Sequence, residues 1–302
     1  MIPIKDEVMT RIEGGISVLS LFDGISSGMV ALERDGIKVD RYLAYEIEPN
    51  AIKISKKNYP EIEHCGDVTV ADFTQYEGFD LLLGGFPCQS LSITRSKTRE
   101  KLDGKSKLFF ECVRAMKEMK PKWFLFENVA SMDKESEEII SGYLGCKPVV
   151  IDSQDFSAQE RHRVYWTNIP VDMNFPRCDL VLKDIMEQNV PEKYFYKQDF
   201  TMLDPDKRVC ASLHINCHDM HKRIVSPNYK CYTLTAVCGG YQHKKVMDNG
   251  RPRRLTPVEY ERLQTLPDGY TAGVSEGARY KALGNGWTVD VIAHILKGIR
   301  AK

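Results

Sequence analysis

Short apolar runs alternate with stretches of helical period between residue 17 and about residue 168. This alternation is typical of a parallel sheet covered by helices. It predicts strands at Ser17–Phe22, Tyr42–Glu46, Asp80–Gly84, Lys122–Glu127, Lys147–Asp152 and Arg163–Thr167, with a weaker strand near Ile62–Cys65. It predicts helices at Gly28–Arg34, Pro49–Asn58, Lys107–Met119 and Lys134–Tyr143. We therefore expect an α/β fold built on a doubly wound sheet.

The residue composition and the secondary-structure pattern of the chain change near residue 175. Prolines, histidines and cysteines accumulate there, and the alternation of strands and helices does not continue. We expect a smaller second domain of loops and short strands at residues 175–275. The segment Arg279–Ile299 is again an apolar helical pattern, so residues 276–302 are expected to rejoin a first domain of residues 1–174.

Composition limits the classes of protein that this chain can represent. Its 42 basic and 42 acidic side chains balance, so a polyanionic partner would be held by local basic clusters rather than by the overall field. Its nine cysteines are scattered singly, which indicates a reducing compartment. There is no run of 18 apolar residues and no signal-peptide pattern. We expect a soluble cytoplasmic protein, a monomer without membrane contact.

The segment Leu82–Ser90 ends an apolar strand on two glycines and leads through Pro87 to Cys88. Open α/β sheets place reactive groups at the carboxyl ends of their strands. A cysteine held there can act as a nucleophile if its thiolate is stabilised. The alternative, a small buried core residue, is common for free cysteine.

The segment Leu19–Gly28 combines a strand end, a glycine turn and serines at a helix start. Glycines let a ligand approach the backbone, and the N–H groups of a helix start accept a negative group. Glu46 ends the next strand, where an acid binds ribose in dinucleotide folds, and Asp67 follows the weak third segment. A glycine turn alone can be purely structural, but together with two strand-end acids it favours a nucleoside ligand.

Two further polar groups follow apolar strands. Glu127 closes the strand Lys122–Glu127, and adjacent parallel strands end on the same edge, so its carboxylate can lie next to Cys88. A helix cap or a solvated strand end is the alternative. Strand alternation would place Gln159, Arg161 and Arg163 on one face, pointing together into a cleft.

These residues, in this order, resemble the motifs of the DNA (cytosine-5) methyltransferases. The resemblance spans nearly the whole chain and rests on several independent motifs. They are the Phe22/Gly24/Gly28 turn, Glu46, Asp67, Pro87-Cys88-Gln89, Glu127-Asn128-Val129, Gln159-x-Arg161-x-Arg163, Arg254-Leu255-Thr256-x-x-Glu259-x-x-Arg262-Leu263-Gln264 and Gly284-Asn285. The fold implied is the Rossmann-like sheet of the S-adenosylmethionine-dependent methyltransferases, with a target-recognition domain at residues 175–275.

The resemblance implies a catalytic set of Cys88, Glu127, Arg161 and Arg163. A Cys88 thiolate adds to carbon 6 of a flipped-out cytosine in a short specific duplex sequence, and carbon 5 then attacks the methyl group of S-adenosylmethionine. Glu127 holds the ring nitrogen and the exocyclic amine, Arg163 contacts the base carbonyl, and Arg161 supports the loop and the phosphates. No metal is needed.

The resemblance also implies two ligand-binding sets. The cofactor set is Phe22, Asp23, Gly24, Ile25, Ser26, Ser27, Glu46, Ile47, Asp67, Val68, Pro87, Asn285 and Trp287. The set for double-stranded DNA is Gln89, Ser92, Thr235, Gly239, Gly240, Arg253 and Arg254. The segment Thr233–Gly240 resembles a target-recognition loop, and Arg251 lies near it. Residues 92–107, with six lysines or arginines against two acids, are suited to closing over the flipped base.

Three alternatives stay open. The first is a tRNA cytosine-5 methyltransferase, faintly suggested by Cys231-Tyr232-Thr233. The second is a non-catalytic binding module, which should lack a reacting group. The third is a zinc site among Cys210, Cys217, His218, Cys231 and Cys238, whose spacing is longer than structural zinc prefers. We expect a free-standing bacterial or phage enzyme, with or without a partner restriction endonuclease.

Overall fold

The computed structural model describes residues 14–87, 107–237 and 239–300. Four of the predictions above therefore fall outside the described residues. They concern Cys88, Gln89 and Ser92 with the rest of the segment predicted to close over the base, and Cys238 of the predicted recognition loop.

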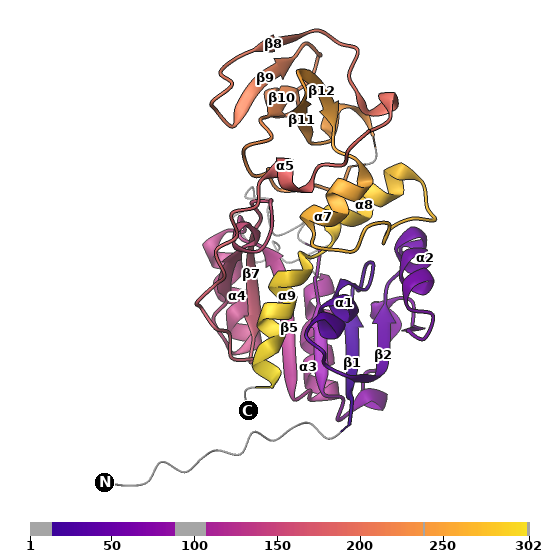
Figure 1. The fold of residues 1–302 in the computed structure, drawn as a ribbon. Helices are drawn as coiled ribbons and strands as arrows, with labels where there is room; N and C mark the ends of the chain where they lie inside the picture. The colour runs from indigo at the N-terminus through magenta and orange to yellow at the C-terminus, as the bar shows by residue number, and fades with distance from the viewer. Residues whose placement is uncertain (1–13, 88–106, 238, 301–302) are drawn as a thin grey trace, which may run out of the picture.

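A seven-stranded sheet with the order β3-β2-β1-β4-β5-β7-β6 forms the larger part of the molecule (Figure 1). All pairings from β3 to β5 are parallel, and the strand order changes direction between β1 and β4. The strands are β1 (Ile16–Leu21), β2 (Val39–Tyr45), β3 (Glu63–His64), β4 (Leu81–Gly84), β5 (Trp123–Val129), β6 (Val149–Asp152) and β7 (His162–Thr167). Each lies within a few residues of its predicted position.

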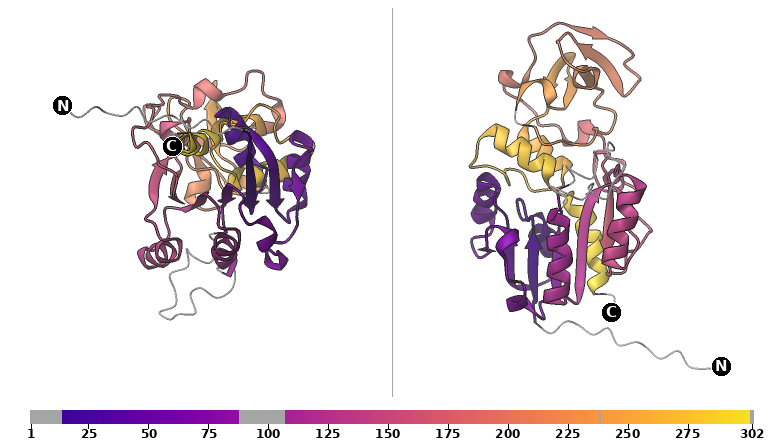
Figure 2. Two further views of the ribbon diagram at one scale, coloured as in Figure 1. Left: turned by 90° about the horizontal axis from the view of Figure 1, so that it is seen from below. Right: turned by 180° about the vertical axis from the view of Figure 1, so that it is seen from behind.

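Helices cover both faces of this sheet, as Figure 2 shows from below and from behind. Side chains alternate between the two faces of a strand, so Val18 packs into one apolar cluster and Leu19 into another. The first cluster joins the sheet to α1 (Ser27–Arg34), α2 (Pro49–Asn58) and α9 (Val289–Leu296), and the second joins it to α3 (Lys107–Met119) and α4 (Lys134–Leu144). The doubly wound arrangement predicted from the sequence is confirmed.

The seventh strand differs from the predicted parallel arrangement. β7 runs antiparallel to both β5 and β6. The physical reason is the short connection between β6 and β7, which contains only the 3₁₀ turn Ser153–Asp155 and no helix. Parallel strands need a crossover of a dozen or more residues, usually a helix, whereas a short link joins antiparallel strands.

The apolar helix predicted at Arg279–Ile299 is interrupted. The structure contains α8 (Glu276–Asn285), then an extended backbone at Gly286, then α9 and the 3₁₀ turn Lys297–Ile299. Buried side chains hold the break, because Arg161 and Gln264 both donate to the Gly286 carbonyl, at 2.9 and 3.0 Å. The break turns Asn285 and Trp287 toward the cavity described below.

A second, five-stranded sheet with the order β12-β11-β10-β9-β8 lies beyond α7 and α8 in Figure 1. We call residues 200–254 the small sheet region. Its elements are β8 (Phe200–Met202), β9 (Val209–Leu213), α6 (Asp219–Lys222), β10 (Arg223–Val225), β11 (Lys245–Asp248) and β12 (Arg251–Arg254), flanked by α5 (Leu182–Ile185) and α7 (Pro257–Leu263). Leu255 and Tyr260 already belong to the core of the large sheet, so α7 lies at the junction. The division at residues 175 and 275 stays a prediction.

Candidate active site

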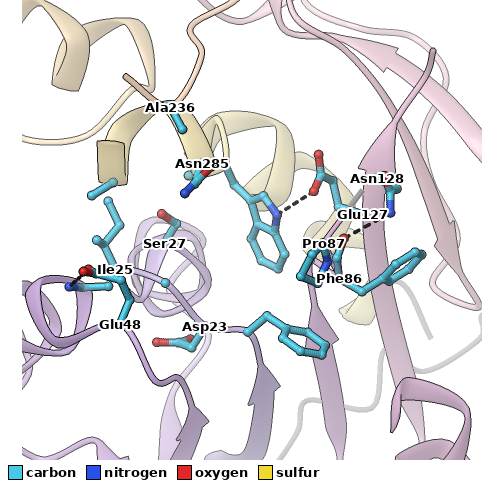
Figure 3. A pocket seen from close by; sticks show the side chains of 18 of the residues that line it. Asp23, Ile25, Ser27, Glu48, Phe86, Pro87, Glu127, Asn128, Ala236 and Asn285 are labelled. Carbon is cyan, nitrogen blue, oxygen red and sulfur yellow. Dashed lines mark hydrogen bonds between the residues drawn. The ribbon is translucent and has the colours of Figure 1, made fainter. Parts of the chain in front are cut away.

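A cavity of about 1170 Å³ opens at the carboxyl ends of β1, β2, β4 and β5. The elements of the large sheet form most of its wall, and the segment at residues 233–236 and the end of α8 close the remainder (Figure 3). The predicted site residues that line it are Phe22, Asp23, Gly24, Ile25, Ser27, Glu46, Ile47, Asp67, Val68, Pro87, Glu127, Arg161, Arg163, Thr235, Asn285 and Trp287.

The turn after β1 is fixed by Glu46. Gly24 adopts a left-handed φ of 62° and donates its backbone N–H to Glu46 Oε2 at 2.8 Å. The other oxygen of Glu46 accepts the N–H groups of Ile47 and Glu48, both at 2.8 Å. Each carboxylate oxygen has two acceptor positions, so Oε2 keeps one for a ligand hydroxyl while the carboxylate orders the turn.

The two adjacent serines have different roles. Ser26 is fully buried and does not line the cavity; its hydroxyl donates to Asp23 and contacts Ser55 at 2.6 Å. The prediction that Ser26 binds the cofactor is therefore corrected: it stabilises the turn. Ser27 lines the cavity, and its buried hydroxyl has no hydrogen-bond partner. A buried unpaired hydroxyl is costly, which favours a ligand as its partner.

The far end of the cavity combines an acid with apolar side chains. Asp67 accepts the Thr69 backbone N–H and hydroxyl at 2.9 Å, and these hydrogen bonds hold the pKa of the Asp67 carboxyl below its usual range. Ile47 is 69% exposed at the edge of the cavity, although it is large and apolar. An aromatic ring bound there would cover it.

Glu127 is the carboxylate at the end of β5, and only 9% of its surface is exposed. Arg163 Nε donates to Glu127 Oε1 at 2.8 Å, and Trp287 Nε1 donates to Oε2 at 3.2 Å. The neighbouring Asn128 donates to the Phe86 carbonyl at 3.1 Å, which ties the end of β5 to the segment leading to Pro87 (Figure 3). Parallel pairing of β4 with β5 brings the two strand ends together.

The predicted common face of Gln159, Arg161 and Arg163 is only partly correct, because Gln159 precedes β7 and is fully buried. Gln159 Oε1 accepts the Leu234 N–H at 2.8 Å, and Arg161 donates to the carbonyls of Leu234, Gly284 and Gly286. Arg161 is 3% exposed and donates to backbone carbonyls, and its predicted support of the loop and the phosphates stays a prediction.

Glycine makes this junction tight. A Cβ on Gly284 would lie 2.3 Å from the Thr235 carbonyl carbon and oxygen, so a side chain there would displace the segment that carries Thr235. The buried amide and guanidinium groups and this glycine together fix Thr235 at the cavity wall.

The other predicted DNA contacts are dispersed. Gly239 and Gly240 line a separate hollow with Cys217, His218, His221, Tyr241 and Gln242. Arg254 has 27% of its side chain exposed and pairs with Glu276 at 3.4 Å, and Arg251 pairs with Glu192 at the surface.

Arg253 contradicts its prediction as a DNA contact. Its side chain has no exposed surface and forms ion pairs with Asp248 at 2.6 Å and with Glu259 at 2.7 Å. Its guanidinium therefore joins β12 to α7 inside the protein.

The described residues contain neither a cluster of metal ligands nor a membrane-spanning helix. Within residues 14–87, 107–237 and 239–300, no group of three or more His, Cys, Asp and Glu side chains is arranged to hold a metal ion. In the same part of the chain, no helix has the length and apolarity needed to cross a bilayer.

The family model "C-5 cytosine-specific DNA methylase" matches residues 16–301. The chain belongs to this family. Among curated proteins, this DNA methylase is 28% identical to the Type II methyltransferase M.HhaI of Haemophilus parahaemolyticus, over 99% of this chain and 97% of the relative.

Two solved structures share the fold of this DNA methylase. The Entamoeba histolytica methyltransferase EhMeth has a TM-score of 0.74 and 18% identity over 95% of this chain and 98% of that one. The S. pombe Dnmt2 methyltransferase has a TM-score of 0.68 and 19% identity over 94% of this chain and 99% of that one.

The family membership establishes the activity class and the methyl donor. The chain is a DNA (cytosine-5) methyltransferase that uses S-adenosylmethionine. The predicted family and fold class are thereby confirmed, and an enzyme is confirmed over a non-catalytic module.

Sequence reasoning missed several groups at the cavity. The indole of Trp287 was predicted to meet only the cofactor, whereas it also donates to Glu127. Lys281 and Ala236 line the wall as well. The helical period of the α8 segment could have placed Lys281 one turn before Asn285, but no pattern in the sequence indicates the bond between Trp287 and Glu127.

Proposed function

We propose that this DNA methylase transfers a methyl group to carbon 5 of a cytosine rotated out of a short specific duplex sequence, through a covalent bond from Cys88. One observation carries the proposal. Glu127 lies at the cavity with both carboxylate oxygens held by donors, and its strand end is tied to the segment whose next residue is Cys88. Carbon 5 is inaccessible in stacked DNA, so the base must be extruded to reach a cavity of this kind.

The cavity is large enough for a cofactor and a base, since typical ligand pockets measure roughly 300–1,000 Å³. S-adenosylmethionine, when bound, supplies a methyl group on a positively charged sulfur. Ser27 and the turn at Gly24 would hold its charged end, and Glu46 and Asp67 would accept hydrogen bonds from its hydroxyl groups. Ile47 and Val68 would contact its ring. The unpartnered Ser27 hydroxyl supports this fit.

The residues of the chain divide the chemistry as follows. The Cys88 thiolate forms a bond to carbon 6, and the electron pair of the ring double bond becomes available at carbon 5. Glu127 holds the protonated ring nitrogen and the exocyclic amine, which stabilises the charge that develops in the ring. After carbon 5 gains the methyl group, a base removes the proton that carbon 5 still carries. The double bond between carbons 5 and 6 then re-forms, and the Cys88 thiolate leaves.

Arg163 has two roles in this proposal. Its bond to Glu127 orients the carboxylate, and its bond to the His162 carbonyl at 2.8 Å fixes the guanidinium. The guanidinium borders the cavity and carries five N–H donors, so it can also reach the carbonyl oxygen of the base.

Recognition of the DNA sequence is assigned to the side of the cavity closed by the small sheet region. Thr235 is the residue of the predicted DNA-binding set that lines this wall of the cavity, and Gly239, Gly240 and the partly exposed Arg254 are the remaining candidates. Such contacts read base edges or hold phosphates.

The test is bisulfite sequencing of DNA from cells that express the wild type or Cys88→Ser. We expect methylated cytosines in one short sequence context with the wild type and none with the variant. Cys146→Ser is the matched control, because Cys146 is a partly exposed cysteine that does not line the cavity.

Purified protein then separates the mechanism from the substrate. Duplex DNA with 5-fluorocytosine at the target should trap the wild type and Cys146→Ser covalently, and should not trap Cys88→Ser. Methyl transfer to tRNA but not to DNA would instead favour a tRNA substrate. Turnover by Cys88→Ser near the wild-type rate would refute the covalent mechanism.

A further inference from the structure

Trp287 approaches Glu127 from a distant part of the chain. It lies in the break between α8 and α9, 160 residues from Glu127, and its Nε1–H donates to Glu127 Oε2 at 3.2 Å. The dashed line at Glu127 in Figure 3 marks this bond. Trp287 and Glu127 therefore line the same cavity although they are far apart in the sequence.

The indole packs beside two glycines, and Gly85 is the closer of the two. A Cβ on Gly85 would lie 3.0 Å from Trp287 Nε1 and 3.4 Å from Glu127 Oε2. A Cβ on Gly28 would lie 3.6 Å from the Trp287 ring as well as 2.7 Å from Leu83. A side chain at Gly85 would therefore crowd the indole N–H, whereas a side chain at Gly28 would clash with Leu83 and only touch the ring.

The backbone on either side of Trp287 is also fixed. Arg161 and Gln264 donate to the carbonyl of Gly286, the preceding residue. The Thr288 hydroxyl, on the following residue, donates to Gln264 Oε1 at 2.8 Å. The indole N–H is thus directed by buried groups rather than by a freely moving loop.

The consequence concerns the rotation of the Glu127 carboxylate. The terminal torsion of a glutamate is broad, so one donor on one oxygen leaves the plane of the carboxylate variable. Here Arg163 holds Oε1 and Trp287 holds Oε2 from a different element. Each oxygen keeps a second acceptor position, and two such positions match the two N–H groups of a protonated cytosine edge.

We infer that Trp287 is a positioning residue for Glu127, whose indole N–H fixes the carboxylate plane in which the target base is held. The inference rests on the proposed function, in which Glu127 holds the base. It assigns the N–H edge of the indole a role separate from contact between the ring and the cofactor.

Trp287→Phe tests it, because phenylalanine keeps an aromatic ring in the same place and removes the donor. The single-turnover rate of methyl transfer should fall about tenfold to a hundredfold. The KM for DNA and the affinity for S-adenosylhomocysteine should change less than about threefold. A variant that loses cofactor affinity in proportion to rate would overturn the inference.

Trp166→Phe is the matched control. Trp166 is buried in the same sheet and its Nε1–H also donates to a side chain, Ser141 Oγ, at 2.9 Å, but it does not line the cavity. We expect its rate per folded molecule to stay within about threefold of the wild type.

A double-mutant cycle with Glu127→Gln separates the inference from the proposed function. Trp287→Phe should add less than about threefold to the loss already caused by Glu127→Gln. Independent, multiplying effects would refute the positioning role. An unaffected rate in Glu127→Gln alone would refute the proposed function instead.

A measurement on a folded protein decides the matter if Trp287→Phe does not fold. The chain has three tryptophans, so the indole N–H resonances can be assigned with ¹⁵N-labelled tryptophan. In Glu127→Gln, the Trp287 resonance should shift and those of Trp123 and Trp166 should not. An unshifted Trp287 resonance would overturn the inference.

Discussion

Two arginine–glutamate ion pairs, one at the edge of the large sheet and one where the small sheet region meets α7, differ in exposure. Arg163 and Glu127 border the cavity, with 13% and 12% of their side chains exposed. Arg253 and Glu259 join the small sheet region to α7 with none of either side chain exposed. The first pair can act on a ligand, whereas the second stabilises a junction.

Other buried polar groups occur in both regions, some with hydrogen-bond partners in the protein and some without. At the large sheet, the buried Ser27 hydroxyl has no partner in the protein. In the small sheet region, the Lys245 ammonium is buried and donates to the carbonyls of Tyr241 and His243, at 2.5 and 3.1 Å. Buried polar atoms without a hydrogen-bond partner also occur in the small sheet region, at Arg208 Nε and Nη2 and at Arg254 Nε, so what distinguishes Ser27 is its place in the cavity wall.

Glu127→Gln should give the largest effect. Glutamine keeps the size of the side chain but replaces one carboxylate oxygen with an NH₂ group. The base therefore loses one hydrogen-bond acceptor and the stabilising negative charge. We expect a fall of about 10²–10⁴-fold in the single-turnover rate of methyl transfer. A rate within threefold of the wild type, measured with urea unfolding as a control for stability, would contradict the division above.

Arg253→Met should act on stability alone. Removing one member of a buried ion pair leaves Glu259 and Asp248 without their partner, which costs about 3–5 kcal/mol of unfolding free energy. The exposed pair offers the control: Arg251→Met should cost at most about 1 kcal/mol. Urea titration measures both. Unchanged stability with weakened DNA binding would restore Arg253 as a DNA contact.

Lys245→Met should alter how stability depends on pH. Burial lowers the pKa of the Lys245 ammonium from 10.5 to about 8, with Lys244 acting in the same direction and Cys217 opposing it. Below pH 8 the folded and unfolded chains both carry the proton, so the full cost of burying the charge is present. Between pH 8 and 10.5 only the unfolded chain keeps the proton, so the contribution of this group to stability rises.

Relative to Lys245→Met, the wild type should therefore gain roughly 2–3 kcal/mol between pH 7 and pH 10.5. Thermal unfolding followed by circular dichroism at a series of pH values measures this. Lys207→Met, at a surface lysine of the same region, should show no such trend. A flat difference between wild type and Lys245→Met would mean that the ammonium is not desolvated.

Ser27→Ala should give the smallest change in free energy of these variants, and it contrasts directly with the neighbouring substitution Ser26→Ala. If the hydroxyl meets the cofactor, its loss costs about 0.5–1.5 kcal/mol, or roughly twofold to tenfold in affinity for S-adenosylhomocysteine. The stability of the ligand-free protein should not fall, because no internal bond is lost. Ser26→Ala should show the reverse, since Ser26 bonds to Asp23 and Ser55. Calorimetry and urea titration separate the two serines.

Much of the large sheet could be predicted from the sequence. Apolar runs of strand length fix β1, β4 and β5, and the rule that parallel strands share an edge places Glu127 beside the segment leading to Cys88. The direction of β7 could not be read, because periodicity gives the existence of a strand and not its partner. The small sheet region lacks that periodicity, so its strands were expected only as a class.

The amino-acid sequence alone determined which side chains lie at the strand ends, because the apolar periodicity of a strand and the glycines of the turn after it depend only on neighbouring residues. Only the tertiary structure decided how each group is used. Arg161 and Arg163 are two residues apart, yet one is directed at buried carbonyls and the other at Glu127. Hydrogen-bond partners such as Trp287 come from distant segments, and the contacts that bring them together depend on the packed fold rather than on the neighbouring sequence.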